Sequence, residues 1–319
     1  MWKADKLIYN GDDSYVMAYQ GNELVWYKAG SNKIYYTSSD NTVIKPDQVY
    51  MPSNIKIVSN TYSGGQGVIV FDMPVVELWR QMFKDKEKLT SITYPSSVRT
   101  ISRDAFNGAD KLKDIIILNG VKNIANLAFA YIQNGLSYDY VVNIPASVES
   151  IGTNPFAGSW KIVNYIVDSN NTYYDSRNGC GAIIETATNK LIAGTSGGFI
   201  PNTVVEIGQL AYNKQAPGNG NLVIPSSVKI IGAQAFFDSQ ELKKVTIPSS
   251  VTSIGSLAFA ECSLLQEVIV NATVPPTLGQ YAFSGNYGPG RKIKVPAASL
   301  QRYKTAPGWK SYASSIVAQ

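Results

Sequence analysis

Residues 224–270 read IPSSVKIIGAQAFFDSQELKKVTIPSSVTSIGSLAFAECSLLQEVIV and contain one pattern twice. Five landmarks of the first copy return 23 residues later in the second: Pro225 and Pro248, Val228 and Val251, Ile231 and Ile254, Phe236 and Phe259, Leu242 and Leu265. A fixed period of this length is typical of a solenoid, in which each unit can bury its apolar face only against its neighbours.

The same pattern extends over most of the chain. Its aromatic landmark is found at Phe83, Phe106, Phe129, Phe156, Tyr212, Phe236, Phe259 and Phe283. The step of 56 residues from Phe156 to Tyr212 equals about two units. The residues between these two landmarks include turn residues at Asn178-Gly179 and Thr188-Asn189. They predict a modified repeat that contains a hairpin.

Within a unit, alternation predicts a short strand. Val268 and Val270 are expected to point inward and Ile269 outward, because successive side chains of a strand face opposite sides. The proline of the next unit is expected just after this strand, at a position whose backbone N–H is not needed for a hydrogen bond to a neighbouring strand. Gly255 is expected to permit a tight bend, and Phe259 to plug the interior.

This pattern strongly resembles the BspA-type (Treponema-type) leucine-rich repeat. The match is carried by Pro248-Ser249-Ser250-Val251, Ile254-Gly255, Ala258-Phe259, Cys262, Leu265 and Val268-x-Val270, and it covers roughly residues 70–315. The resemblance implies surface adhesion and binding of proteins or matrix, without catalysis. Ala109 occupies the Cys262 position in another copy, which indicates a packing role for this cysteine.

The predicted fold is therefore a repeat solenoid of leucine-rich repeats, mostly β with short helical and turn segments, behind a small N-terminal β module. The predicted domains are a β module and docking segment at 1–48, an N-terminal cap at 49–70, the repeats at 71–295 with a hairpin insertion at 173–194, and a C-terminal cap at 296–319. Terminal caps are expected because a solenoid would otherwise expose its core. A short helix starting near Ser299 is expected in the C-terminal cap.

Composition excludes several kinds of site. The chain has no histidine, which removes Ser-His-Asp and Cys-His catalysis and every His-ligated metal site. Its two cysteines cannot form a cysteine cluster, and Cys180 and Cys262 fall in different repeats, so a disulfide between them is not expected. The carboxylates are scattered, and we expect no enzyme activity, cofactor or metal. Calcium at Asp168, Asn170, Asn171 and Asp175 is the weaker alternative to ordinary turns.

Charge and hydropathy limit the kinds of partner that the sequence predicts. The net charge of +5 is dispersed, which does not favour nucleic acid, and no apolar run approaches the length of a membrane span. The start, MWKADKLIYNG, lacks the apolar core of a secretory signal. We expect an extracellular or cell-surface adhesin that binds a host or matrix protein or a surface glycan. The alternatives are a phage tail or virion component, attached to a larger assembly through the N-terminal module, and a pure scaffold.

Two sets of residues are candidate binding sites. The first is the outward, concave strand face, where apolar residues would form an interrupted stripe exposed to solvent. This stripe is a candidate because exposed apolar surface often marks a partner site. The second is the hairpin insertion, because Tyr and Arg are favoured at interface hot spots. The strand-face residues are Ile116, Asn143, Ile166, Val223, Lys244, Thr246, Ile269, Lys292 and Lys294, and the hairpin residues are Tyr173, Tyr174 and Arg177.

Overall fold

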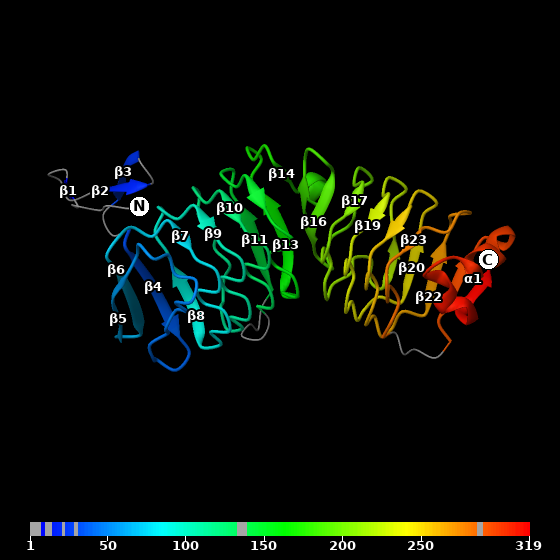
Figure 1. Ribbon diagram of the computed structural model, residues 1–319, viewed down its shortest axis with the longest axis horizontal. Coiled ribbons are helices and arrows are strands. Elements are labelled where there is room, and N and C mark those ends of the chain that lie inside the picture. Colours follow the sequence, from blue (N-terminus) through cyan, green and yellow to red (C-terminus); the bar gives the residue numbers. More distant parts are fainter. Residues whose placement is uncertain (1–7, 10–14, 21–22, 29–30, 133–138, 286–289) are drawn as a thin grey trace. The chain divides into compact units, whose positions relative to one another are not determined.

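The computed structural model describes residues 8–9, 15–20, 23–28, 31–132, 139–285 and 290–319 (Figure 1). The described contacts divide the chain into two units: unit 1 is residues 1–137 with 147–155, and unit 2 is residues 138–146 with 156–319. Strands dominate, so the predicted repeat solenoid of mostly β structure is confirmed. The helical segments described are η1 (Arg177–Gly179), η2 (Ala297–Ser299), α1 (Leu300–Thr305) and η3 (Trp309–Ser315).

The described residues of unit 1 form three sheets. An antiparallel sheet at the N-terminus comprises β1 (Ile8–Tyr9), β2 (Tyr15–Gln20) and β3 (Glu23–Lys28). A second antiparallel sheet has the order β5-β6-β4-β8, with β4 (Lys33–Ser38), β5 (Ile57–Ser63), β6 (Gln66–Phe71) and β8 (Leu89–Thr93). Residues 48 and 49, the predicted module boundary, lie between β4 and β5, which both pair with β6. The third sheet is parallel, with β7 (Glu77–Leu78), β9 (Thr100–Ile101), β10 (Asn123–Ile124) and β12 (Ser150–Ile151).

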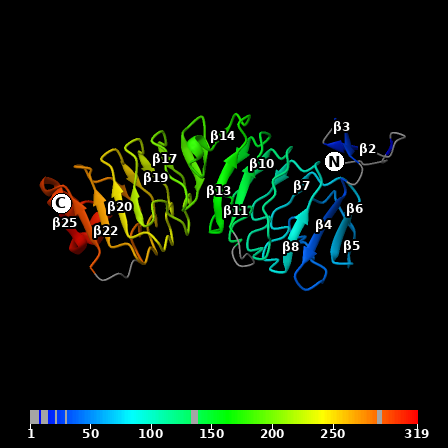
Figure 2. The same cartoon turned by 180° about the vertical axis from the view of Figure 1, so that it is seen from behind.

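Unit 2 carries long strands on one side of each repeat and short strands on the other, as Figures 1 and 2 show. The long parallel strands are β11 (Tyr140–Ile144) with β13 (Ile162–Val167), and β18 (Asn221–Val223), β20 (Lys244–Ile247), β22 (Glu267–Val270), β24 (Lys292–Val295) and β25 (Ile316–Ala318). The short-strand sheet begins with the antiparallel β14 (Tyr174–Asp175), β15 (Ala182–Glu185) and β16 (Lys190–Gly194) and continues in parallel through β17 (Glu206–Ile207), β19 (Ile230–Ile231), β21 (Ser253–Ile254) and β23 (Thr277–Leu278).

The core of each unit is a column of aromatic rings, one from each repeat. In unit 1, Phe83 and Phe106 stack with ring centroids 5.4 Å apart, and Phe106 and Phe129 at 5.0 Å. In unit 2, Tyr212, Phe236, Phe259 and Phe283 form a continuous column with interplanar angles of 4–7°. Rings that are parallel at these separations are offset, which is a favourable aromatic geometry. The column explains why the aromatic landmark recurs once per unit.

The glycine that recurs in the repeats is required for a reason other than the predicted tight bend. Gly255 does not adopt a positive φ. A Cβ built on it would lie 2.4 Å from the backbone nitrogen of Ala233 in the preceding repeat, and one on Gly279 would lie 2.2 Å from that of Ser256. Glycine is therefore required by the close approach of neighbouring backbones, and not by a tight bend.

The turns that carry the aromatic rings are joined by hydrogen bonds that all point the same way. The N–H groups of Gln234, Phe236 and Asp238 donate to the carbonyls of Ser256, Ala258 and Ala260 in the following repeat, at 2.8–2.9 Å. Leu257, Phe259 and Glu261 donate in turn to Gln280, Ala282 and Ser284. The N–H groups of each aromatic turn therefore donate to the carbonyls of the following repeat. The N–H groups of the last repeat have no following repeat to accept their hydrogen bonds.

The C-terminal segment supplies that missing partner. The Tyr312 hydroxyl accepts a hydrogen bond from the Phe283 N–H at 3.2 Å. Trp309 is fully buried and donates its indole N–H to the carbonyl of Pro276 at 2.7 Å. The expected helix is α1, but the Ser299 hydroxyl donates to the Thr273 carbonyl, and it makes no capping bond to the helix.

Candidate functional site

The long strands of unit 2 place two rows of side chains outward. The first row runs through Asn221, Lys244, Glu267 and Lys292, and the second through Val223, Thr246, Ile269 and Lys294, with each residue paired in register to the next. The residues between them, such as Leu222 and Val245, are buried. We call these two rows, together with Asn143 and Ile166 on the separate parallel pair β11 and β13, the outward strand face.

The structure brings most of the predicted strand-face residues together. Val223 is 70% exposed and Ile166 47% exposed, whereas Lys244, Thr246, Ile269 and Lys294 are half-buried, and Asn143 and Lys292 are exposed. Asn143 and Ile166 are paired in register on β11 and β13. Ile116, which is also exposed, belongs to unit 1.

Sequence reasoning missed Phe199, which precedes the same kind of Ile-Pro turn as Val223. The segment Ile200-Pro201 is followed by the same turn as Ile224-Pro225, since the Val204 N–H donates to the Pro201 carbonyl at 3.0 Å and the Val228 N–H to the Pro225 carbonyl at 3.1 Å. Ile200 is buried and Phe199 is 45% exposed. The repetition of Ile-Pro-x-x-Val could have revealed it, but Gly197-Gly198 interrupts the strand-like alternation.

Apolar exposure continues toward β11 and β13. Val163 is the extra residue of a bulge, because Tyr140 pairs with Ile162 and Val141 pairs with Asn164. Val141 and Val163 are both exposed, and so is Trp160 just before β13. The Lys161 ammonium lies 4.6 Å from the centre of the Trp160 ring, a cation–π distance.

The opposite end of the outward strand face is charged. Glu267 receives the ammonium groups of two neighbouring strands, Lys244 at 2.7 Å on Oε1 and Lys294 at 2.9 Å on Oε2. These hydrogen bonds lower the pKa of Glu267 below its ordinary value. Lys292 is exposed and forms no ion pair with the residues that the structure describes.

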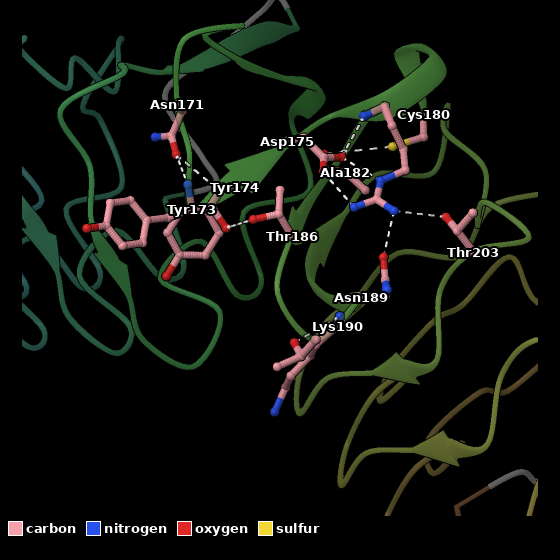
Figure 3. Close-up of polar contacts among 12 residues, drawn as sticks. Asn171, Tyr173, Tyr174, Asp175, Cys180, Ala182, Thr186, Asn189, Lys190 and Thr203 are labelled. Carbon is pink, nitrogen blue, oxygen red and sulfur yellow. Dashed lines mark hydrogen bonds and ion pairs between the residues drawn. The ribbon is translucent and has the colours of Figure 1, made fainter.

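The hairpin residues have different surroundings from one another (Figure 3). Arg177 holds both oxygens of Asp175, at 2.7 and 2.6 Å, and its Nη1 donates to Asn189 at 2.7 Å and Thr203 at 3.1 Å. These bonds tie η1 to the segments before β16 and β17, and the bonds to Asp175 raise the pKa of Arg177. Tyr174 is buried, so Tyr173, which is 49% exposed, is the hairpin tyrosine available to a partner.

The oxygen-rich segment before the hairpin forms turns. Asp168 Oδ1 accepts the Asn170 N–H at 2.8 Å, and Asn171 Oδ1 accepts the N–H groups of Tyr173 and Tyr174 at 2.9 Å. Such bonds are the usual reason for Asp and Asn in turns. Among the residues that the structure describes, no group of three His, Cys, Asp or Glu side chains could hold a metal ion. No helix in the described ranges has the length and apolar character needed to cross a bilayer.

Both cysteines are buried free thiols. The Cys262 Sγ lies 3.1 Å from the carbonyl oxygen of Phe236, and burial raises the pKa of Cys262 to about 12. Burial also raises the pKa of Cys180. Protonated, enclosed thiols are inert, which agrees with a packing role.

Solved structures similar to the chain are bacterial repeat proteins. A leucine-rich repeat protein from Eubacterium ventriosum is 22% identical with a TM-score of 0.52, and the match covers 70% of this chain and 64% of that protein. The chain thus spans less than two thirds of that relative. The pneumococcal vaccine antigen PcpA is 16% identical over 99% of both chains, with a TM-score of 0.49. No curated protein matches the chain.

The sequence itself matches a family. Six copies of the region described as "BspA type Leucine rich repeat region" are found at residues 55–180 and 198–302. These ranges include the repeats from which the outward strand face is built. The chain belongs to the BspA-type leucine-rich repeat family.

Proposed function

We propose that this chain is a non-enzymatic protein-binding module and that the outward strand face of unit 2 is its recognition surface. The observation that carries the proposal is the exposure of Ile166, Phe199 and Val223 at 47%, 45% and 70%, on repeats whose inward side chains are buried. Large apolar side chains exposed on a well-packed domain are typical of a partner site. Membership of a repeat family that is consistent with protein binding supports the same role.

A binding screen against matrix proteins and surface glycans tests the proposal. Val223→Ser and Phe199→Ser are expected to weaken binding of a captured protein at least tenfold, as loss of a central apolar anchor does. Val274→Ser is the matched control, because Val274 is a valine of unit 2 that is also more than half exposed and lies outside the outward strand face. Equal effects of all three substitutions, or binding to glycans alone, would count against the proposal.

The finer part of the proposal is adhesion at a cell surface, to a host or matrix protein. The alternative is a virion role, in which the sheet β1-β2-β3 docks the chain to a larger assembly. It is favoured by one observation: β1-β2-β3 pairs with no other strand among the described residues. Neighbouring genes distinguish the two, since tail and capsid genes would support the virion role and outer-membrane genes the adhesin role.

A further inference from the structure

The outward strand face changes character along the repeats. Its end on β18 carries the exposed Val223 beside Asn221, both uncharged. Its other end, on β20, β22 and β24, carries Lys244, Glu267, Lys292 and Lys294. A partner that covers both ends must therefore match an apolar surface at one end and a charged surface at the other.

The charged end is positive. Three lysines and one glutamate leave an excess of two positive charges on these strands (3 − 1). Glu267 already has one lysine on each oxygen, so it has little capacity to neutralise Lys292, its register partner on β24. Neighbouring strands lie about 4.8 Å apart, well within a Debye length of about 8 Å, so the lysines act on a partner together.

We propose that the partner is a protein segment that carries an apolar side chain near one or more carboxylates, and that it lies across the strands with its acidic end on β22 and β24. The proposal rests on the proposed function and specifies the chemistry of the partner. Ile269 and Thr246 lie among the lysines, and Val223 and Asn221 on β18 are uncharged, so a uniformly charged polyanion would match only one end.

The register also sets a spacing. Val223 and Lys294 are three strands apart, about 14 Å at the usual strand separation. An extended chain advances about 3.3–3.6 Å per residue. The apolar residue and the carboxylate should therefore be separated by about four positions in the partner.

A random dodecapeptide display library, panned against the full chain, tests this chemistry. We expect enriched peptides to contain an aromatic or aliphatic residue about four positions from Asp or Glu. Binding of such a peptide, measured by fluorescence anisotropy, should weaken about tenfold in Lys292→Glu/Lys294→Glu and weaken with salt. Lys229→Glu, an exposed lysine just before β19 on the opposite sheet, should bind as the wild type does.

Several results would overturn the inference: no enriched peptide, peptides without acidic residues, or unchanged binding in the lysine variants. Heparin that binds through the lysines while Val223→Ser has no effect would identify a polyanionic glycan instead. If Val223→Ser abolishes binding of a captured protein and charge reversal does not, the proposed function stands and only the partner chemistry fails. If the double variant Lys292→Glu/Lys294→Glu unfolds, the single variant Lys292→Glu replaces it in the test, because Lys292 takes part in no ion pair among the described residues.

Discussion

The stacked aromatic of each repeat is the residue on which the core depends most. Phe236 is fully buried between Tyr212 and Phe259, with ring centroids 5.2 and 5.1 Å away. Phe236→Ala is expected to lower the free energy of unfolding by about 3–5 kcal/mol, because it removes transfer energy and leaves a cavity that stacked neighbours cannot fill. Urea denaturation measures this. A stability close to wild type would show that the ring is not a core plug.

The reactivity of the two cysteine thiols is a second prediction at the scale of residues. Burial raises the pKa of Cys262 to about 12 and also raises that of Cys180, so both are protonated at pH 8. We expect no reaction with Ellman's reagent in the native protein and two equivalents after denaturation in guanidinium. Rapid labelling of the native protein would contradict the packing role assigned to them.

At the scale of elements, the one-directional hydrogen bonds of the aromatic turns need an acceptor at their end. Tyr312 provides it to the Phe283 N–H. Tyr312→Phe keeps the ring, which lies 5.6 Å from that of Phe283, but leaves this donor unsatisfied. A loss of about 1–3 kcal/mol is expected, the cost of an unpaired buried donor. Thermal denaturation measures it, and Tyr281→Phe, at an exposed tyrosine, is the control.

The lysine–glutamate bridge between strands gives a pH-dependent prediction. The pKa of Glu267 is lowered in the folded protein, so its contribution to stability is present above the unfolded value of about 4.3 and is lost as pH falls through the folded pKa. Glu267→Gln should cost less than about 1 kcal/mol at pH 7, since the bridge is solvent-accessible, and less again at pH 3, where protonation of Glu267 in the folded protein has begun to remove the ion pairs.

Urea titrations of wild type and Glu267→Gln at pH 7, 5 and 3 measure this difference. Lys244→Ala is the companion variant and should fold normally, because Lys244 points outward. If Glu267→Gln costs as much at pH 3 as at pH 7, the ion pairs do not cause the effect.

At the scale of the whole molecule, stability should follow the stacking of repeats. A repeat between two others is held on both sides, whereas an edge strand is held on one. Hydrogen exchange should therefore be slowest for amides such as that of Phe236, which donates to the next repeat, and fast for half the amides of β5, the edge of its sheet. Uniform protection across β5 and β20 would indicate a partner on the β5 edge.

The sequence by itself determined the solenoid. A strict recurrence of proline, glycine and aromatic landmarks can be satisfied only when neighbouring units stack, so the period in sequence becomes the step between repeats. Strand alternation likewise determined which of Thr246 and Ile247 points outward, because this depends on local backbone geometry alone.

The tertiary structure decided what depends on partners far apart in the chain. Arg177 is bonded to Asn189 and Thr203, 12 and 26 residues away, and Tyr174 is buried, so the hairpin offers a partner less than its sequence suggests. Phe199 is 45% exposed before a turn that repeats the one after Val223, although glycines break the strand-like alternation that precedes it. Glu267 lies between two lysines because stacking sets the register of its strand against both neighbours, and no single repeat contains that information.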